Sequence, residues 1–241
     1  MKYSYSRVDC FKQCPFKYKC RYIDRIKTLP NYDANNPLVL GTALHRGIET
    51  DVDTAIKEYY AHFPVITDDQ INEAIKLEIL IPKVKSVLPK GEHEVKVECE
   101  NFVGYIDLLC EGNNTPLQDI YDFKYTSNTN RYSDSQQLHI YKYYKGNIGK
   151  LYYVFVPKVN IRQKKTETLF EFRQRLREKC EQTEITIKEV PYDYSKVQEF
   201  LDGIKNIETA TEYPRKESGL CERFCEYYGI CKLGVDYEIV E

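Results

Sequence analysis

The hydrophobic pattern of the chain changes its period near residue 95, and this change constrains the fold more than any other feature. Before it, apolar residues recur every three or four positions, which predicts helices at 38–62 and 67–88 after a helical segment at 6–27. After it, apolar and charged residues alternate, which predicts strands. A chain with both patterns must pack helices against a sheet. Its 241 residues can bury such a core, and without repeats or low-complexity linkers they predict one domain over 1–241.

The second half of the chain predicts a sheet followed by further helices. The expected strands are 95–99, 102–109, 120–125, 151–156 and 185–190, and the expected helices are 133–144, 167–179 and 194–209. Gly112-Asn113-Asn114-Thr115-Pro116 is rich in turn-forming residues and joins two of these strands. This order of elements predicts an α/β sandwich.

Two aspartates lie inside apolar strands. Asp122 and Lys124 are two positions apart, so they share one face of their strand. A symmetric hairpin around the turn at 112–117 puts Asp107 opposite Asp122, with Cβ atoms about 5 Å apart. Because facing carboxylates in an apolar sheet repel and lose hydration, we expect Lys124 and a divalent cation such as Mg²⁺ or Mn²⁺ between them. The alternative is a buried Asp–Lys pair with the other aspartate exposed at a strand end.

Three more residues are candidates that carry little weight by themselves. His45 lies near the start of a predicted helix, where it could bind a metal or simply pair with Glu49 one turn away. Gln137 and Tyr141 share one face of another predicted helix because they are four positions apart.

Positive charge is unevenly distributed along a chain whose net charge is −2. Residues 1–28 hold eight basic and two acidic residues, hence +6, and residues 158–179 hold eight basic and three acidic residues, hence +5. These two segments are either sites for a polyanion or solvated helix faces. The N-terminus lacks the apolar stretch of a signal peptide, and no apolar run could span a bilayer, so we expect a cytoplasmic protein without membrane contact.

In order along the chain, these residues resemble the motif series of RecB-like PD-(D/E)XK nucleases. The matching motifs are Ser4-Tyr5-Ser6, Cys14-Pro15-Phe16, Gly41 to His45, Gly104 to Asp107, Asp122 to Lys124, and Gln137 to Tyr141. The resemblance implies a restriction-endonuclease-like core, with a mixed central sheet flanked by helices. It also implies a Mg²⁺- or Mn²⁺-dependent DNA exonuclease of recombination, repair or phage DNA processing, acting on DNA with free or single-stranded ends.

The resemblance also implies a role for each matching residue. His45, Asp107, Asp122 and the Phe123 carbonyl would bind one or two metal ions, Lys124 would orient or deprotonate the attacking water, and Gln137 and Tyr141 would position the scissile strand. Tyr125 departs from the pattern, because many relatives have threonine directly after the lysine. Two alternatives stay open: a spacer-processing CRISPR nuclease, and a DNA-binding subunit that has lost catalysis. The intact metal-binding and lysine positions argue against the second.

Nine cysteines form two clusters and three isolated positions. The clusters are Cys10, Cys14 and Cys20, and Cys221, Cys225 and Cys231, while Cys99, Cys110 and Cys180 are expected in the core. Clustered cysteines in a reducing compartment favour metal ligation over disulfides.

The late cysteine triplet resembles that of iron–sulfur members such as the AddB nuclease and the CRISPR spacer-processing exonucleases. Their fourth ligand lies in an N-terminal Cys-Pro context that Cys14 matches. The resemblance implies that a 4Fe–4S cluster on Cys14, Cys221, Cys225 and Cys231 staples the 10–20 and 221–231 segments together. Cys10 and Cys20 are rival ligands, and a Zn²⁺ site is the chemical alternative.

Overall fold

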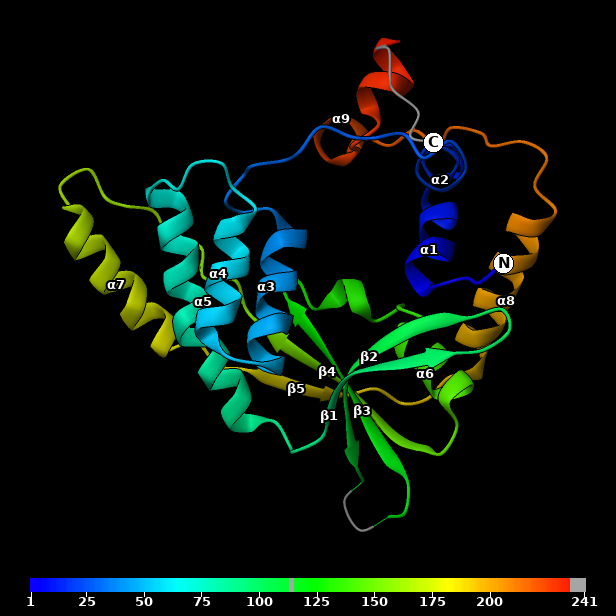
Figure 1. Cartoon of the computed structure of the whole chain (residues 1–241), viewed down its shortest axis with the longest axis horizontal. Coiled ribbons are helices and arrows are strands. Elements are labelled where there is room, and N and C mark those ends of the chain that lie inside the picture. The colour runs from blue at the N-terminus through cyan, green and yellow to red at the C-terminus, as the bar shows by residue number, and fades with distance from the viewer. Residues whose placement is uncertain (113–114, 235–241) are drawn as a thin grey trace.

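The computed structural model describes residues 1–112 and 115–234 and has a five-stranded sheet at its centre (Figure 1). The strands, in spatial order, are β1 (Glu92–Glu98), β2 (Val103–Glu111), β3 (Gln118–Tyr125), β4 (Ile148–Val156) and β5 (Thr186–Glu189). The β3–β4 pair is parallel and the other pairs are antiparallel, so the sheet is mixed. Asn113 and Asn114 of the expected turn, and residues 235–241, lie outside the described residues.

Helices cover both faces of this sheet (Figure 1). The α-helices are α1 (Tyr5–Gln13), α2 (Pro15–Tyr18), α3 (Pro37–Glu49), α4 (Val52–Ala61), α5 (Asp68–Val87), α6 (Gln137–Lys145), α7 (Leu169–Glu181), α8 (Tyr194–Glu208) and α9 (Cys221–Phe224). Two π-helical turns, η1 (Lys19–Ile23) and η3 (Gly229–Leu233), and one 3-10 turn, η2 (Asn130–Tyr132), accompany them. One core lies between the sheet and α3, α4 and α5, and the other between the sheet and α1, α6 and α8. The α/β architecture predicted from the sequence is confirmed.

Helix caps explain where the sequence prediction succeeds and where it fails. Thr67 forms a capping box with Gln70, and α5 begins directly after it as expected. The single helix expected over 38–62 is wrong, because α3 ends at Glu49 and a new helix, α4, starts at Val52. The Asp51 side chain accepts a hydrogen bond from the backbone N–H of Thr54 and so caps α4. Among the described residues, no helix is both long and apolar enough to cross a membrane.

The register between β2 and β3 matches the symmetric hairpin predicted from the sequence. Leu108 pairs with Tyr121, and the next pair away from the site is Leu109 with Ile120. The backbone pairing ends at Leu108–Tyr121, and the same register continued by one step puts Asp107 opposite Asp122, where the Phe123 N–H bonds the Asp107 side chain. This register places both carboxylates at the centre of the sheet.

Gly104 allows helix α6 to lie close to strand β2. A Cβ atom added at Gly104 would lie 2.6 Å from Cε1 of Tyr141 and 2.9 Å from Cζ of the fully buried Phe102. Both contacts are shorter than carbon atoms tolerate, so any side chain at this position would push the Tyr141 ring away from the strand. The glycine therefore fixes the distance between α6 and the sheet.

We predict that Gly104→Ala lowers the free energy of unfolding by about 1–3 kcal/mol, because the added methyl group overpacks the contact with Tyr141 and Phe102. Gly41→Ala is the matched control: Gly41 lies within α3, and a Cβ there meets no atom within 4 Å. That substitution should raise stability by about 0.5–1 kcal/mol. Urea denaturation of both variants measures these changes, and a Gly104→Ala protein as stable as the wild type would contradict the packing argument.

Candidate functional site

His45 joins helix α3 to the two central strands. Its Nδ1 lies 3.4 Å from Oδ1 of Asp107, and its Nε2 lies 3.1 Å from the carbonyl oxygen of Phe123. The backbone N–H of Phe123 donates to Oδ2 of Asp107 at 2.6 Å. The alternative pairing of His45 with Glu49 is wrong, because Glu49 accepts from the Arg46 guanidinium at 2.7 Å.

Asp122 and Lys124 form an ion pair on one face of β3. Asp122 is 1% exposed and Asp107 is 8% exposed, so the alternative in which one aspartate is exposed at a strand end is wrong. The Lys124 ammonium contacts Oδ2 of Asp122. Among the described residues, neither oxygen of this carboxylate accepts a well-aligned hydrogen bond. A buried carboxylate in this state has capacity for another positive partner.

The directions in which the pKa values of these groups shift follow from burial and from the charges that face one another. Burial raises the pKa of Asp122 most, Lys124 partly offsets this, and Asp107 raises the pKa again, so the net direction is upward. Burial alone would raise the pKa of Asp107, but His45 and Lys124 lower it below its ordinary value. Burial alone would lower the pKa of Lys124, but Asp122 and Asp107 raise it. The two carboxylates compete for one ammonium group, and Asp122 is the one driven toward protonation.

Helix α6 holds Lys124 from the other side. The Lys124 ammonium donates to Oε1 of Gln137 at 3.0 Å, and Nε2 of Gln137 donates to the hydroxyl of Tyr141 at 3.2 Å. The ammonium also lies 5.6 Å from the ring centroid of Tyr132 and 5.9 Å from that of Tyr153. Gly104 leaves room for the Tyr141 ring, so this contact between α6 and β2 helps to position Gln137 beside the lysine.

Glu94 is a functional candidate that the sequence analysis missed. His45, Glu94 and Asp107 each offer one possible metal-ligand atom, and these three atoms all lie within 4.8 Å of one another. Val95 pairs with Ile106 in β1–β2, and the same register puts Glu94 opposite Asp107. In the sequence, Glu94 belongs to an ordinary alternating strand of charged residues. Extending the register argument from β2 to β1 is the one signal that could have identified it.

These residues fit a divalent cation. The donors are three carboxylates, one imidazole and one backbone carbonyl: Glu94, Asp107, Asp122, His45 and Phe123. Oxygen ligands with one imidazole suit small divalent metals, which would also neutralise the repulsion between the buried carboxylates. The observation that supports this fit best is the buried Asp122 carboxylate, because its Oδ1 has no hydrogen-bond partner among the described residues while its Oδ2 contacts Lys124.

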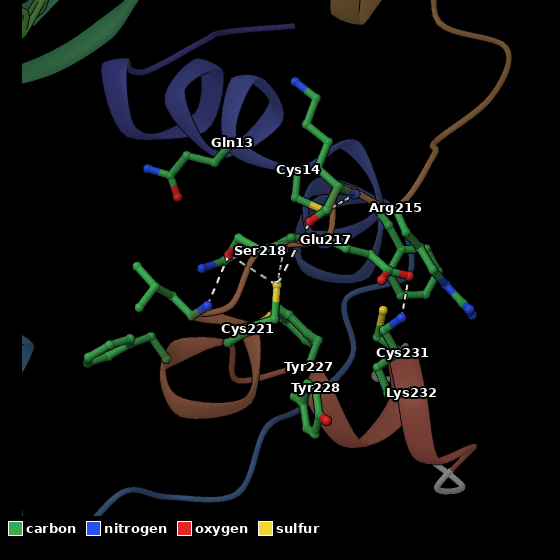
Figure 2. A pocket seen from close by; sticks show the side chains of 16 residues that line it. Gln13, Cys14, Arg215, Glu217, Ser218, Cys221, Tyr227, Tyr228, Cys231 and Lys232 are labelled. Carbon is green, nitrogen blue, oxygen red and sulfur yellow. Dashed lines mark hydrogen bonds and ion pairs between the residues drawn. The ribbon is translucent and has the colours of Figure 1, made fainter.

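The two cysteine clusters meet at a cavity of about 350 Å³ far from the sheet (Figure 2). Its lining includes Cys14, Cys221, Cys225 and Cys231, which come from the α1–α2 junction and from the C-terminal segment around α9 and η3. Cys10 and Cys20 are both buried and do not line it, although Cys20 belongs to a small hydrophobic cluster with Ile26 and Tyr227, against which Cys225 also packs. All nine cysteines are free thiols. Of the remaining three, Cys110 and Cys180 are buried as expected, while Cys99 is partly exposed.

Comparisons with known proteins identify one family. The family model described as the PD-(D/E)XK nuclease superfamily matches residues 2–232. The chain is also similar to the solved crystal structure of SSO0001, with 12% sequence identity and a TM-score of 0.44, over 98% of this chain and 87% of that one. No curated protein matches the chain.

We predict that Glu94→Gln weakens Mn²⁺ binding at least about tenfold, because a neutral amide replaces one carboxylate of the His45–Glu94–Asp107 group. Isothermal titration calorimetry measures the affinity. Glu92→Gln is the matched control: Glu92 is an exposed acid on the same strand and lies outside this group. Equal Mn²⁺ affinities for the two variants would exclude Glu94 as a ligand.

Proposed function

Because this chain belongs to the PD-(D/E)XK nuclease superfamily, we propose that it is a DNA exonuclease that hydrolyses phosphodiester bonds with Mg²⁺ or Mn²⁺. Members of the superfamily are nucleases that use divalent metals. The observation that carries the proposal is the convergence of the buried Asp107 and Asp122 with Lys124 and His45 at one point of the sheet.

The acidic residues and His45 would hold the metal. Asp107, Asp122, His45 and the Phe123 carbonyl form the proposed ligand set, with Glu94 as an additional ligand. A bound divalent cation lowers the pKa of a coordinated water and polarises a phosphoryl oxygen. The hydrogen bond from the Phe123 N–H to Asp107 orients this carboxylate before any ligand arrives.

Lys124 would act directly on the reacting atoms. Its ammonium can donate to the attacking water and stabilise the negative charge that develops on the phosphorane. Gln137 and Tyr141 would position Lys124 through their hydrogen bonds and support the scissile strand beside it. In this arrangement one face of β3 would supply both the metal ligand Asp122 and Lys124, which acts on the attacking water.

The proposed activity predicts that Asp122→Asn and Lys124→Ala each reduce cleavage of end-labelled linear DNA about 10²-fold or more, because each removes a charged group from the reacting centre. Asp122→Asn should change the stability of the metal-free protein little, because the lost repulsion with Asp107 offsets the lost ion pair with Lys124. Glu92→Gln should cleave like the wild type. Retained cleavage in a folded Asp122→Asn protein would refute the proposed site.

Circular DNA separates the remaining functional alternatives. An exonuclease degrades the linear substrate and spares a covalently closed circle. Cleavage of the circle would instead identify an endonuclease. A wild-type protein that binds DNA but cleaves neither form would favour the alternative of a catalytically inactive DNA-binding subunit.

We also propose that Cys14, Cys221, Cys225 and Cys231 hold a 4Fe–4S cluster. The cavity lining supports this set, because it includes Cys14 and neither Cys10 nor Cys20. Cys20 stays the nearer rival, since it shares a hydrophobic cluster with Cys225. Zn²⁺ bound by the same four thiolates is the chemical alternative.

The cluster predicts that anaerobically purified protein is brown and contains about four irons per chain. Cys14→Ala should remove the colour and lower the melting temperature, because the cluster would join the N-terminal helices to the C-terminal segment. Cys10→Ala, four positions away in α1, should keep the colour. Visible absorption and iron analysis test both variants. A colourless protein with one zinc per chain would support the Zn²⁺ alternative instead.

A further inference from the structure

The two basic segments of the sequence differ in whether their charges are neutralised. In the N-terminal segment five basic residues contact carboxylates: Lys2 with Glu98, Lys12 with Glu199, Lys17 and Arg21 with Glu226, and Lys19 with Asp24. Most of these acids come from distant parts of the chain. The positive charge of this segment therefore serves mainly to attach the N-terminal helices to the rest of the protein.

The second basic segment divides into a paired helix and an unpaired loop. On helix α7, Arg173, Arg175 and Arg177 form ion pairs with Asp68, Glu167 and Glu78, at 2.8, 2.7 and 3.0 Å. In the loop between β4 and α7, no carboxylate of the described residues lies within ion-pair distance of Lys158, Arg162, Lys164 or Lys165. Apart from the half-buried Lys158, these loop residues are exposed. The free positive charge of the second segment is concentrated in the loop.

Arg131 connects this loop to the candidate active site. The Arg131 guanidinium lies 5.2 Å from the ring centroid of Tyr132, and the Lys124 ammonium lies 5.6 Å from the same centroid. No carboxylate of the described chain is within ion-pair distance of Arg131.

The loops after β3 and β4 also bond to each other. Ser127 Oγ donates to the carbonyl of Lys158 at 3.2 Å and accepts from its N–H at 3.1 Å. Because β3 and β4 are parallel, both loops leave the same edge of the sheet, where Lys124 lies. We call the five residues Arg131, Lys158, Arg162, Lys164 and Lys165 the basic rim.

We propose that the basic rim binds the phosphates of a single DNA strand whose scissile phosphate lies beside Lys124. This inference rests on the proposed function, because it assigns the surface along which the DNA substrate lies outside the candidate active site. The rim carries unpaired cations, and such cations supply most of the affinity of proteins for nucleic acid backbones. From Lys158 to Lys165 the chain can span at most about 25 Å, which is long enough to contact several phosphates.

The depth of the site favours a single strand over a duplex. Asp122 is 1% exposed and the Lys124 side chain is 14% exposed, so a phosphate must turn inward to reach them. A duplex resists local bending, with a persistence length of about 150 base pairs, whereas a single strand turns freely. The half-buried Tyr132, between Lys124 and Arg131, offers an aromatic ring on which an unpaired base can stack.

The salt dependence of DNA binding tests the rim. The probe is a fluorescent single-stranded 20-mer DNA in EDTA, where binding is measured by anisotropy without cleavage. For Lys164→Gln/Lys165→Gln, the slope of log Kd against log salt concentration should fall by about 1.4, which is about 0.7 for each lost phosphate contact. Lys164→Arg/Lys165→Arg should restore the slope, because the charges return.

Arg173→Gln/Arg177→Gln is the matched control. This variant also removes two positive charges, but from helix α7, where both arginines already form ion pairs. The slope of log Kd against log salt concentration should therefore stay at the wild-type value. Equal falls in both double variants would show an effect of net charge alone and overturn the proposal. Tighter binding of a 20-base-pair duplex than of the single strand would also overturn it. Cleavage of DNA by the wild type tests the proposed function separately, so either idea can fail while the other stands.

Discussion

Two buried carboxylates on neighbouring strands, Asp107 and Asp122, create the constraint that the site depends on. The β2–β3 register sets them side by side, where they repel and have little water to screen them. The protein supplies only part of the compensation: Lys124 contacts Asp122, while His45 and a backbone N–H contact Asp107. The proposed divalent cation would stabilise this arrangement, which costs some stability without it.

The two layers of helices make different contributions to this point of the sheet. From one face, α3 brings His45 to Asp107 and to the end of β3. From the other face, α6 holds Lys124 through Gln137 and Tyr141. The proposed metal ligand His45 and the lysine Lys124 therefore depend on separate packing contacts, so damage to one layer need not displace the residue held by the other.

Ion pairing decides where positive charge remains available to a ligand. Acids from other segments neutralise most of the N-terminal lysines and the α7 arginines, whereas among the described residues the side-chain cations of the loop after β4 form no ion pair, because its Glu167 pairs with Arg175 instead. Net charge along the sequence is thus a poor guide to a binding surface. The more useful quantity is the charge left over after the folded chain has formed its ion pairs.

The sequence by itself determined the features that depend on local pattern. Alternation and helical periodicity predicted the α/β layers, and the symmetric turn predicted the register that brings Asp107 to Asp122. The break between α3 and α4 was missed because the helical spacing of apolar residues continues across the Asp51 cap.

Only the tertiary structure decided that Glu94, and not another acid of its strand, lies beside His45. It likewise decided that Cys14, and not Cys10 or Cys20, lines the cavity of the late cysteines. It also decided which cations stay unpaired, such as Lys164, and which do not, such as Arg173. The physical reason is the same in each case: these neighbours are far apart along the chain, and local periodicity carries no information about contacts between distant segments.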